Sequence, residues 1–172
     1  MSEFSKNTLL KSFIIYFPTI LLLVSVLNEF DFNYLDLDYF SFNFPFILIF
    51  YWNLKREESI GYGLIFIAGL INDVITGFPI GISSLSYLLI CGFAAYLRNI
   101  TLRPSILKDL LFFLFTVSIV NSFIYSLLVI FFSVDMNYIY IFLNVIFTFS
   151  FYYIFARLFD LYRMIFFGNS YE

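Results

Sequence analysis

The sequence contains no histidine, a single cysteine and few charged residues of either sign. Histidine is the commonest general base and metal ligand near neutral pH, so its absence removes the usual centre of a hydrolytic or metal site. Cys91 lies in an apolar run without a second cysteine, and we interpret it as a small buried hydrophobic residue. We therefore expect a protein that is not an enzyme and that holds no metal and no cofactor.

Charged residues make up 12% of the chain, against roughly 25% in a typical soluble domain. Hydrophobic residues make up 62% of the 172 residues, and the mean hydropathy is +0.95. The net charge of −3 gives no indication of a nucleic-acid partner, and none is expected. This composition predicts an integral membrane protein surrounded by the lipid bilayer.

Six apolar runs along the chain predict six transmembrane helices, several of them near the short limit of the roughly 17–25 residues that a span requires. The sequence therefore predicts an all-α fold in which residues 1–172 form a single six-helix transmembrane domain. The predicted spans are residues 9–27, 39–54, 60–75, 80–97, 110–133 and 138–158.

Basic residues are confined to one side of this six-span arrangement, whereas the acidic residues divide evenly between the two sides. Lysine and arginine concentrate in cytoplasmic loops of membrane proteins, so the basic side should be cytoplasmic. Both termini should then be cytoplasmic, and the protein should be a multi-pass protein of the cell membrane. The basic residues are Lys6, Lys11, Lys55, Arg56, Arg98, Arg103, Lys108, Arg157 and Arg163.

The segment 61–85, GYGLIFIAGLINDVITGFPIGISSL, combines apolar residues with several glycines and one carboxylate, Asp73. Small residues let helix backbones approach closely in lipid, so we expect the third and fourth spans to be in close contact along Gly69 and Gly81. Residues 76–79 leave room only for a tight hairpin connection. Pro79 suits the first turn of the following helix, where its missing N–H would have no partner in any case.

Asp73 is an ionisable residue near membrane depth, which is a functional-site hypothesis by default. Its carboxylate lies near the C-terminus of a predicted helix, where the helix dipole is unfavourable to a negative charge. Water, the exposed N–H groups at the start of the next helix, or a partner protein could offset this cost. The alternatives are a turn with an Asp at the outer surface and a site that docks a partner. Asn121 and Asn144, in the last two spans, are interpreted as interhelical hydrogen-bonding residues.

The pattern of residues in this segment resembles the rod shape-determining protein MreD family. The resemblance implies a non-catalytic inner-membrane subunit of the bacterial elongation (rod) complex, which takes part in cell-shape maintenance and lateral peptidoglycan synthesis. It implies MreC, a periplasmic coiled-coil membrane protein, as the partner, with MreB and RodA and its transpeptidase as further partners. The residues that carry the resemblance are Gly63, Gly69, Leu70, Asp73, Gly77, Pro79, Gly81 and Leu85.

The MreD family is similar in architecture to the substrate-binding subunits of energy-coupling-factor transporters, so a vitamin-binding subunit is the alternative function. A third alternative is an unrelated six-span scaffold or flippase-like protein. Within the resemblance, Gly63, Gly69, Asp73, Gly77, Pro79 and Gly81 are the candidate residues for partner binding or helix packing. The groove beside Asp73 could hold a protein helix, a lipid or nothing.

Overall fold

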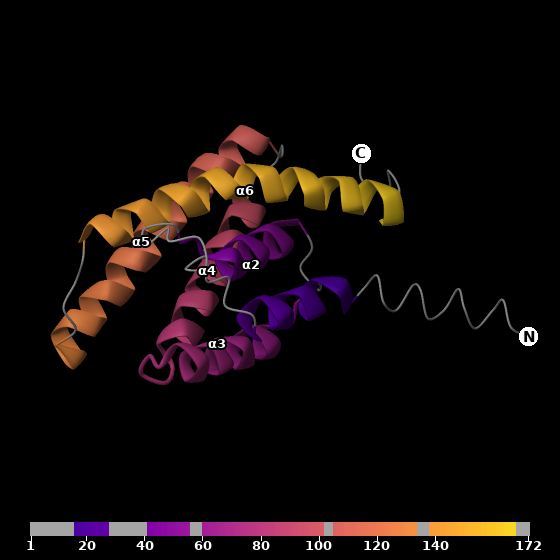
Figure 1. The fold of residues 1–172 in the computed structure, drawn as a ribbon. Helices are drawn as coiled ribbons and strands as arrows, with labels where there is room; N and C mark the ends of the chain where they lie inside the picture. Colours follow the sequence, from indigo (N-terminus) through magenta and orange to yellow (C-terminus); the bar gives the residue numbers. More distant parts are fainter. Residues whose placement is uncertain (1–15, 28–40, 56–59, 102–104, 134–137, 168–172) are drawn as a thin grey trace, which may run out of the picture.

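The computed structural model describes residues 16–27, 41–55, 60–101, 105–133 and 138–167, and all regular secondary structure in them is helical (Figure 1). The predicted all-α fold is confirmed for these residues. The helices are an N-terminal helix, Tyr16–Leu27, followed by α2 (Phe44–Lys55), α3 (Tyr62–Thr76), α4 (Ile82–Ile100), α5 (Ile106–Phe132) and α6 (Tyr138–Phe167).

Several helix ends differ from the predicted spans. Helix α6 continues nine residues beyond the predicted end at residue 158, so Arg157 and Arg163 lie within the helix and do not mark its end. Helix α5 begins at Ile106, four residues before the predicted start. Hydropathy marks where apolar residues stop, whereas lysine and arginine are good helix formers that let a helix continue past that point. Predicted residues 9–15 and 39–40 lie outside the described ranges.

Helix α2 occupies the centre of the bundle, and every residue from Phe44 to Leu54 is buried. A helix that is hydrophobic on all faces must be surrounded on all faces. Helix α4 lies against one side of it and α6 against another, and Figure 1 shows α2 between α6 and the α3–α4 hairpin. Pro45 lies in the first turn of α2, where an N–H group is not required. Twelve residues rise only about 18 Å, less than the roughly 30 Å of a hydrocarbon core.

Aromatic rings fill the space between α2, α5 and α6. The Tyr152 ring of α6 stacks on Phe113 of α5 with centroids 4.2 Å apart, and meets Phe50 of α2 edge-on at 5.7 Å. The Phe50 and Phe113 rings are themselves 5.0 Å apart. Offset and edge-on ring pairs add roughly 0.5–1.5 kcal/mol each to the energy of burial. One ring cluster thus joins three helices.

Charged and polar groups converge on the C-terminal end of α2. Lys55 Nζ lies 2.7 Å from Asp109 Oδ2 at the start of α5, and both side chains are largely buried. Arg98, near the end of α4, donates from Nη1 to the Asn53 carbonyl oxygen at 2.8 Å. The last carbonyl groups of a helix have no intrahelical partner, and cations there also complement the helix dipole. Arg98 supplies both a donor and a positive charge, whereas Lys55 supplies a positive charge and pairs with Asp109.

The opposite end of α2 is also held by polar contacts. The backbone N–H of Asn43 donates to Thr148 Oγ1 of α6 at 2.9 Å, and Asn144 Nδ2 donates to Ser41 Oγ at 2.7 Å. Asn144 was predicted to make an interhelical hydrogen bond, but its bond joins α6 to a residue outside the helices. Its acceptor precedes α2 in the chain and does not belong to a helix.

These contacts show that consecutive helices from α2 to α6 alternate in direction. The C-terminal ends of α2 and α4, the start of α5 and the second half of α6 meet at one end of the bundle, where Tyr51 donates to Asp160 at 2.6 Å. All the basic residues in the described ranges belong to this end, as the predicted charge distribution requires. They are Lys55, Arg98, Lys108, Arg157 and Arg163.

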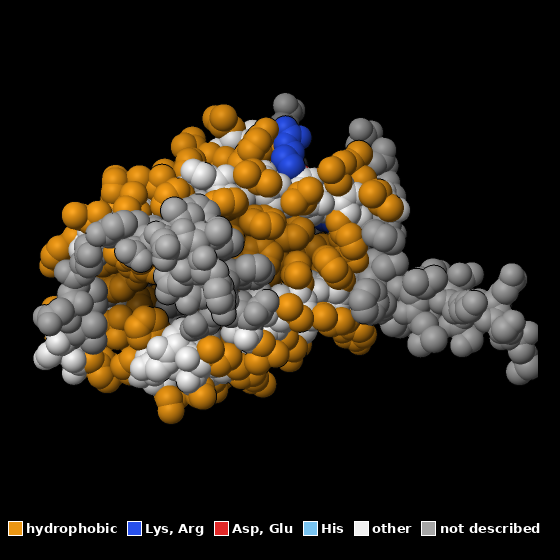
Figure 2. Space-filling model, in the orientation of Figure 1, with side chains coloured by type: hydrophobic (Ala, Val, Ile, Leu, Met, Phe, Trp, Pro, Cys, Tyr) orange, Lys and Arg blue, Asp and Glu red, His pale blue; other side chains and the backbone are white. Residues whose placement is uncertain are grey.

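Two of these helices, Ile106–Phe132 and the segment Tyr138–Ile165 of α6, are long and apolar enough to cross a membrane. The N-terminal helix and α3 are apolar but shorter. Hydrophobic side chains predominate over the described part of the surface shown in Figure 2, and α5 and α6 in particular expose many large apolar side chains. Crossing by all six helices remains a prediction.

The Lys55–Asp109 ion pair leads to a stability prediction. Replacing one member of a buried ion pair leaves the other charge uncompensated, which costs roughly 3 kcal/mol. We expect Lys55→Met to destabilise the protein by about that amount, and the double variant Lys55→Met/Asp109→Leu to recover most of the loss. Thermal unfolding in detergent would measure both, with Lys108→Met, at an exposed neighbouring position, as the control. A double variant as unstable as the single one would contradict the ion-pair account.

Candidate functional site

The segment 61–85 contains α3, the connection and the start of α4, and these two helices make the most extensive helix–helix contact in the described structure. One face of α3 is buried, and its residues recur at intervals of three and four, as a single helical face requires. Leu64, Phe66 and Ile67, on the other side of α3, are exposed. The buried residues of α3 are Ile65, Ala68, Gly69 and Asp73.

Asp73 is fully buried, with 0% of its surface exposed, and its carboxylate joins the end of α3 to the start of α4. Oδ2 accepts a hydrogen bond from the Gly81 backbone N–H at 2.7 Å, and Oδ1 accepts one from the Ser83 backbone N–H at 2.8 Å. The first N–H groups of a helix have no intrahelical acceptor, and a negative charge is stabilised there by the helix dipole. Gly81, the N-cap residue of α4, has no side chain to supply this acceptor. Asp73 therefore caps α4 from the preceding helix.

The sequence left open how the unfavourable interaction between the Asp73 carboxylate and the dipole of its own helix is offset, and this arrangement answers that question. The N–H groups at the start of α4 provide the compensation, so neither an intramolecular cation nor a partner protein is needed for it. The carboxylate is not exposed on the protein surface, because it is enclosed and each of its oxygens has an N–H donor. A buried carboxylate is tolerated when its hydrogen bonds are complete.

Gly69 lies where α3 and α4 approach most closely. A Cβ atom added at Gly69 would lie 2.4 Å from Ser84 Cα and 2.5 Å from Ser84 N, so the position has no room for any side chain. Two hydrogen bonds flank the contact. Ser84 Oγ donates to the Phe66 carbonyl oxygen at 2.9 Å, and Asn72 Nδ2 donates to Ser83 Oγ at 2.9 Å. The predicted close packing is confirmed at Gly69.

The same prediction is wrong at Gly81, where an added Cβ would meet nothing within 4 Å. Gly81 has φ of 102° and Gly77, which ends α3, has φ of 70°, so both adopt left-handed conformations that disfavour other residues. Pro79 lies in the connection before Gly81 and not in the first turn of α4, and its carbonyl oxygen accepts from the Ile82 N–H. Gly63 is exposed and has open space around it.

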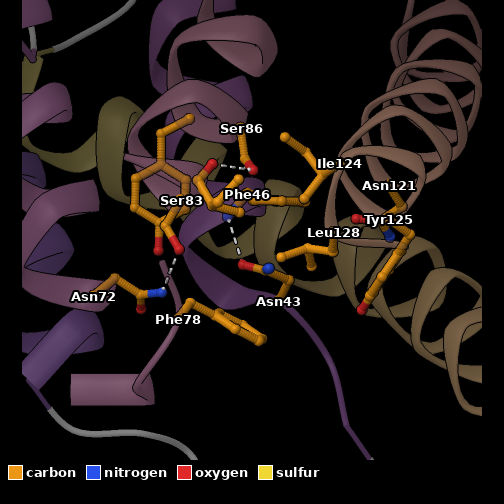
Figure 3. Close-up of a pocket in the computed structure, with 12 residues that line it drawn as sticks. Asn43, Phe46, Asn72, Phe78, Ser83, Ser86, Asn121, Ile124, Tyr125 and Leu128 are labelled. Atoms are coloured by element: carbon orange, nitrogen blue, oxygen red, sulfur yellow. Dashed lines mark hydrogen bonds between the residues drawn. The ribbon is translucent and has the colours of Figure 1, made fainter. Parts of the chain in front are cut away.

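The structure also brings together polar residues that the sequence did not group. A recess of about 80 Å³ lies between the start of α2, the α3–α4 hairpin and α5 (Figure 3). Asn121 was predicted to be an interhelical hydrogen-bonding residue, but it has no hydrogen-bond partner in the described structure and lines this recess instead. An isolated asparagine in an apolar run was the only signal in the sequence. The other polar lining residues are Asn43, Asn72, Ser83, Ser86, Tyr87 and Tyr125.

The chemistry available in this region is hydrogen bonding and close packing. In the part of the chain that the structure describes, no three acidic or cysteine side chains come together in a way that could hold a metal ion. The candidate site is therefore a capped and tightly packed hairpin beside a neutral polar recess.

The close contact at Gly69 leads to a prediction with a matched glycine control. We expect Gly69→Ala to separate α3 from α4 and to lower stability by about 2 kcal/mol, because the added methyl group would meet backbone atoms that cannot move aside. Gly63→Ala should be neutral or stabilising by up to about 1 kcal/mol, because alanine favours a helix and has open space there. Thermal unfolding in detergent would compare the two. Equal effects would contradict the role assigned to Gly69.

No protein-family model, curated protein or solved structure matches this chain.

Proposed function

We propose that this chain is a non-catalytic, six-span subunit of the bacterial elongation complex in the inner membrane, acting in cell-shape maintenance through contacts with an MreC-like membrane protein. The observation that carries the proposal is the α3–α4 hairpin. Three residues of the MreD-like pattern have specific structural roles in it: Asp73 caps α4, Gly69 permits the helix contact, and Gly81 adopts the required left-handed conformation. The pattern therefore corresponds to one folded unit.

The distribution of apolar and basic side chains supports the proposed membrane location. Large hydrophobic side chains are exposed along α3, α5 and α6, where acyl chains would cover them. The basic residues of the described ranges gather at one end of the bundle, which becomes the cytoplasmic end under the positive-inside rule. Asp73 and the recess then belong to the periplasmic end.

The burial of Asp73 moves the proposed docking surface to the exposed face of α3. The hairpin holds this face rigidly, and Gly63 has open space that would admit a partner helix backbone. Close approach at small residues is a common basis of helix association in membranes. We propose that the transmembrane helix of the MreC-like protein packs here. The large apolar side chains on this face include Leu64, Ile67, Val74 and Ile75.

Site-specific photo-crosslinking in bacterial membranes would test this surface. Val74 on α3 and Phe131 on α5 have nearly equal exposure, 72% and 71%, so they form a matched pair of labelling positions. We expect a photoreactive residue at position 74 to give an adduct with a co-expressed MreC-like protein, and one at position 131 to give none. The Gly69→Ala variant, labelled at position 74, should lose the adduct because α3 is no longer held in place.

An adduct at position 131 alone would place the partner on α5 and contradict the docking surface. If neither position reacts while the MreC-like protein co-purifies, the proposed docking surface on α3 is also contradicted. If the MreC-like protein also fails to co-purify with the full-length chain, although both proteins accumulate, the proposed function itself fails.

A further inference from the structure

The polar side chains of the described residues that line the recess are all neutral. Amides and hydroxyl groups line it on several sides, with Asn121 and Tyr125 from α5 facing Asn72 and Ser83 from the hairpin (Figure 3). Among the residues that the structure describes, no charged side chain belongs to the lining. The carboxylate of Asp73 accepts a hydrogen bond from the backbone N–H of Ser83, a lining residue, but Asp73 itself is fully buried and does not line the recess.

Some of these polar groups have no partner within the described part of the protein. Asn121 is 92% buried, at 8% exposure, and neither its amide oxygen nor its amide nitrogen makes a hydrogen bond. The hydroxyl groups of Tyr87 and Tyr125 also make none, although Tyr87 is almost fully buried. These polar atoms are not sealed in the protein but border the open space of the recess, so their hydrogen-bonding capacity is available to a ligand there. A ligand with matching donors and acceptors could complete those hydrogen bonds.

The other polar side chains in the lining each make a hydrogen bond within the protein. Asn121 is therefore the amide side chain in the lining that makes none. Asn72 donates to Ser83, and Ser86 Oγ donates to the Ile82 carbonyl oxygen at 2.9 Å. Asn43 Oδ1 accepts from the Phe46 N–H at 3.3 Å. The unpaired groups therefore lie mainly on the α5 side of the recess, together with Tyr87.

We propose that this recess is a binding site for the carboxamide group of a small neutral ligand, a role that goes beyond the proposed scaffold function. A carboxamide presents a donor and an acceptor together, which is the complement of the Asn121 side chain, and tyrosine hydroxyl groups can donate to its carbonyl oxygen. A carboxylate or ammonium ligand would lose its hydration without gaining an opposite charge. Apolar side chains beside the polar groups, including Phe46, Phe78 and Leu128, would contact the carbon atoms of the ligand.

The volume sets the size of the ligand. A water molecule occupies about 30 Å³ of liquid, so 80 Å³ corresponds to two or three waters or to a ligand of about five heavy atoms. Propionamide has this size, and a ligand so small should bind with about millimolar affinity. A larger natural ligand would place its amide here and extend through the open side of the recess.

Ligand-observed NMR on the full-length protein in lipid nanodiscs would test the proposal with propionamide as the probe. We expect saturation transfer to propionamide and none to propionate, which has the same shape but carries a charge. Asn121→Leu should weaken propionamide binding about tenfold through the loss of paired hydrogen bonds. Tyr125→Phe, which removes a single hydroxyl group, should weaken it by a smaller factor and provides a second variant if Asn121→Leu does not fold.

Asn144→Leu is the matched control, because Asn144 bonds Ser41 and does not line the recess. It should bind propionamide as the unmodified protein does. Equal transfer to propionamide and propionate would overturn the proposal, as would undiminished binding in folded Asn121→Leu and Tyr125→Phe. The absence of any transfer to propionamide would mean that the recess holds water only. Each of these results would leave the crosslinking test of the docking surface unaffected.

Discussion

The architecture depends on one constraint: helix α2 is apolar on every face and must be buried on every face. Helices α4 and α6 pack against it, and the Phe50–Phe113–Tyr152 ring cluster brings in α5. The polar groups at its C-terminal end, Lys55 and the Asn53 carbonyl, are reached by the ends of neighbouring helices. A short central helix thus determines where the longer helices begin and end around it.

The α3–α4 hairpin connects the buried helix α2 to the surface of the protein. Helix α4 packs against α2 on one side and against α3 on the other, so α3 is held by a helix that is itself fixed to the centre. Asp73 and Gly69 make that second contact specific, the first by satisfying the N–H groups of α4 and the second by allowing Ser84 to approach. A rigid outer helix with an apolar face is a suitable platform for a partner in the membrane, which is how the proposed scaffold role follows from the packing.

Much of the fold could be predicted from the sequence, because long apolar runs mark helices and the placement of the basic residues indicates which helix ends meet at one end of the bundle, although it does not fix where each helix stops. The burial of α2 could not, since a run that is apolar all round is suited equally to lipid and to a protein interior. Gly69 and Gly81 look alike in the sequence, yet one serves a close contact and the other a left-handed backbone conformation. The carboxylate of Asp73 could be placed near the start of α4, but only the geometry shows that both of its oxygens accept backbone hydrogen bonds.

The central claim, that α2 is enclosed by the other helices, can be tested with the single native tryptophan once the protein is placed in lipid, as its proposed membrane location requires. Trp52 lies on α2, is 1% exposed, and is packed against Phe159 and Tyr162. In vesicles of brominated lipid its fluorescence should be little quenched, whereas a Trp52→Phe/Phe131→Trp variant should be strongly quenched through the exposed position on α5. Equal, strong quenching of both proteins would place α2 against lipid and contradict the account.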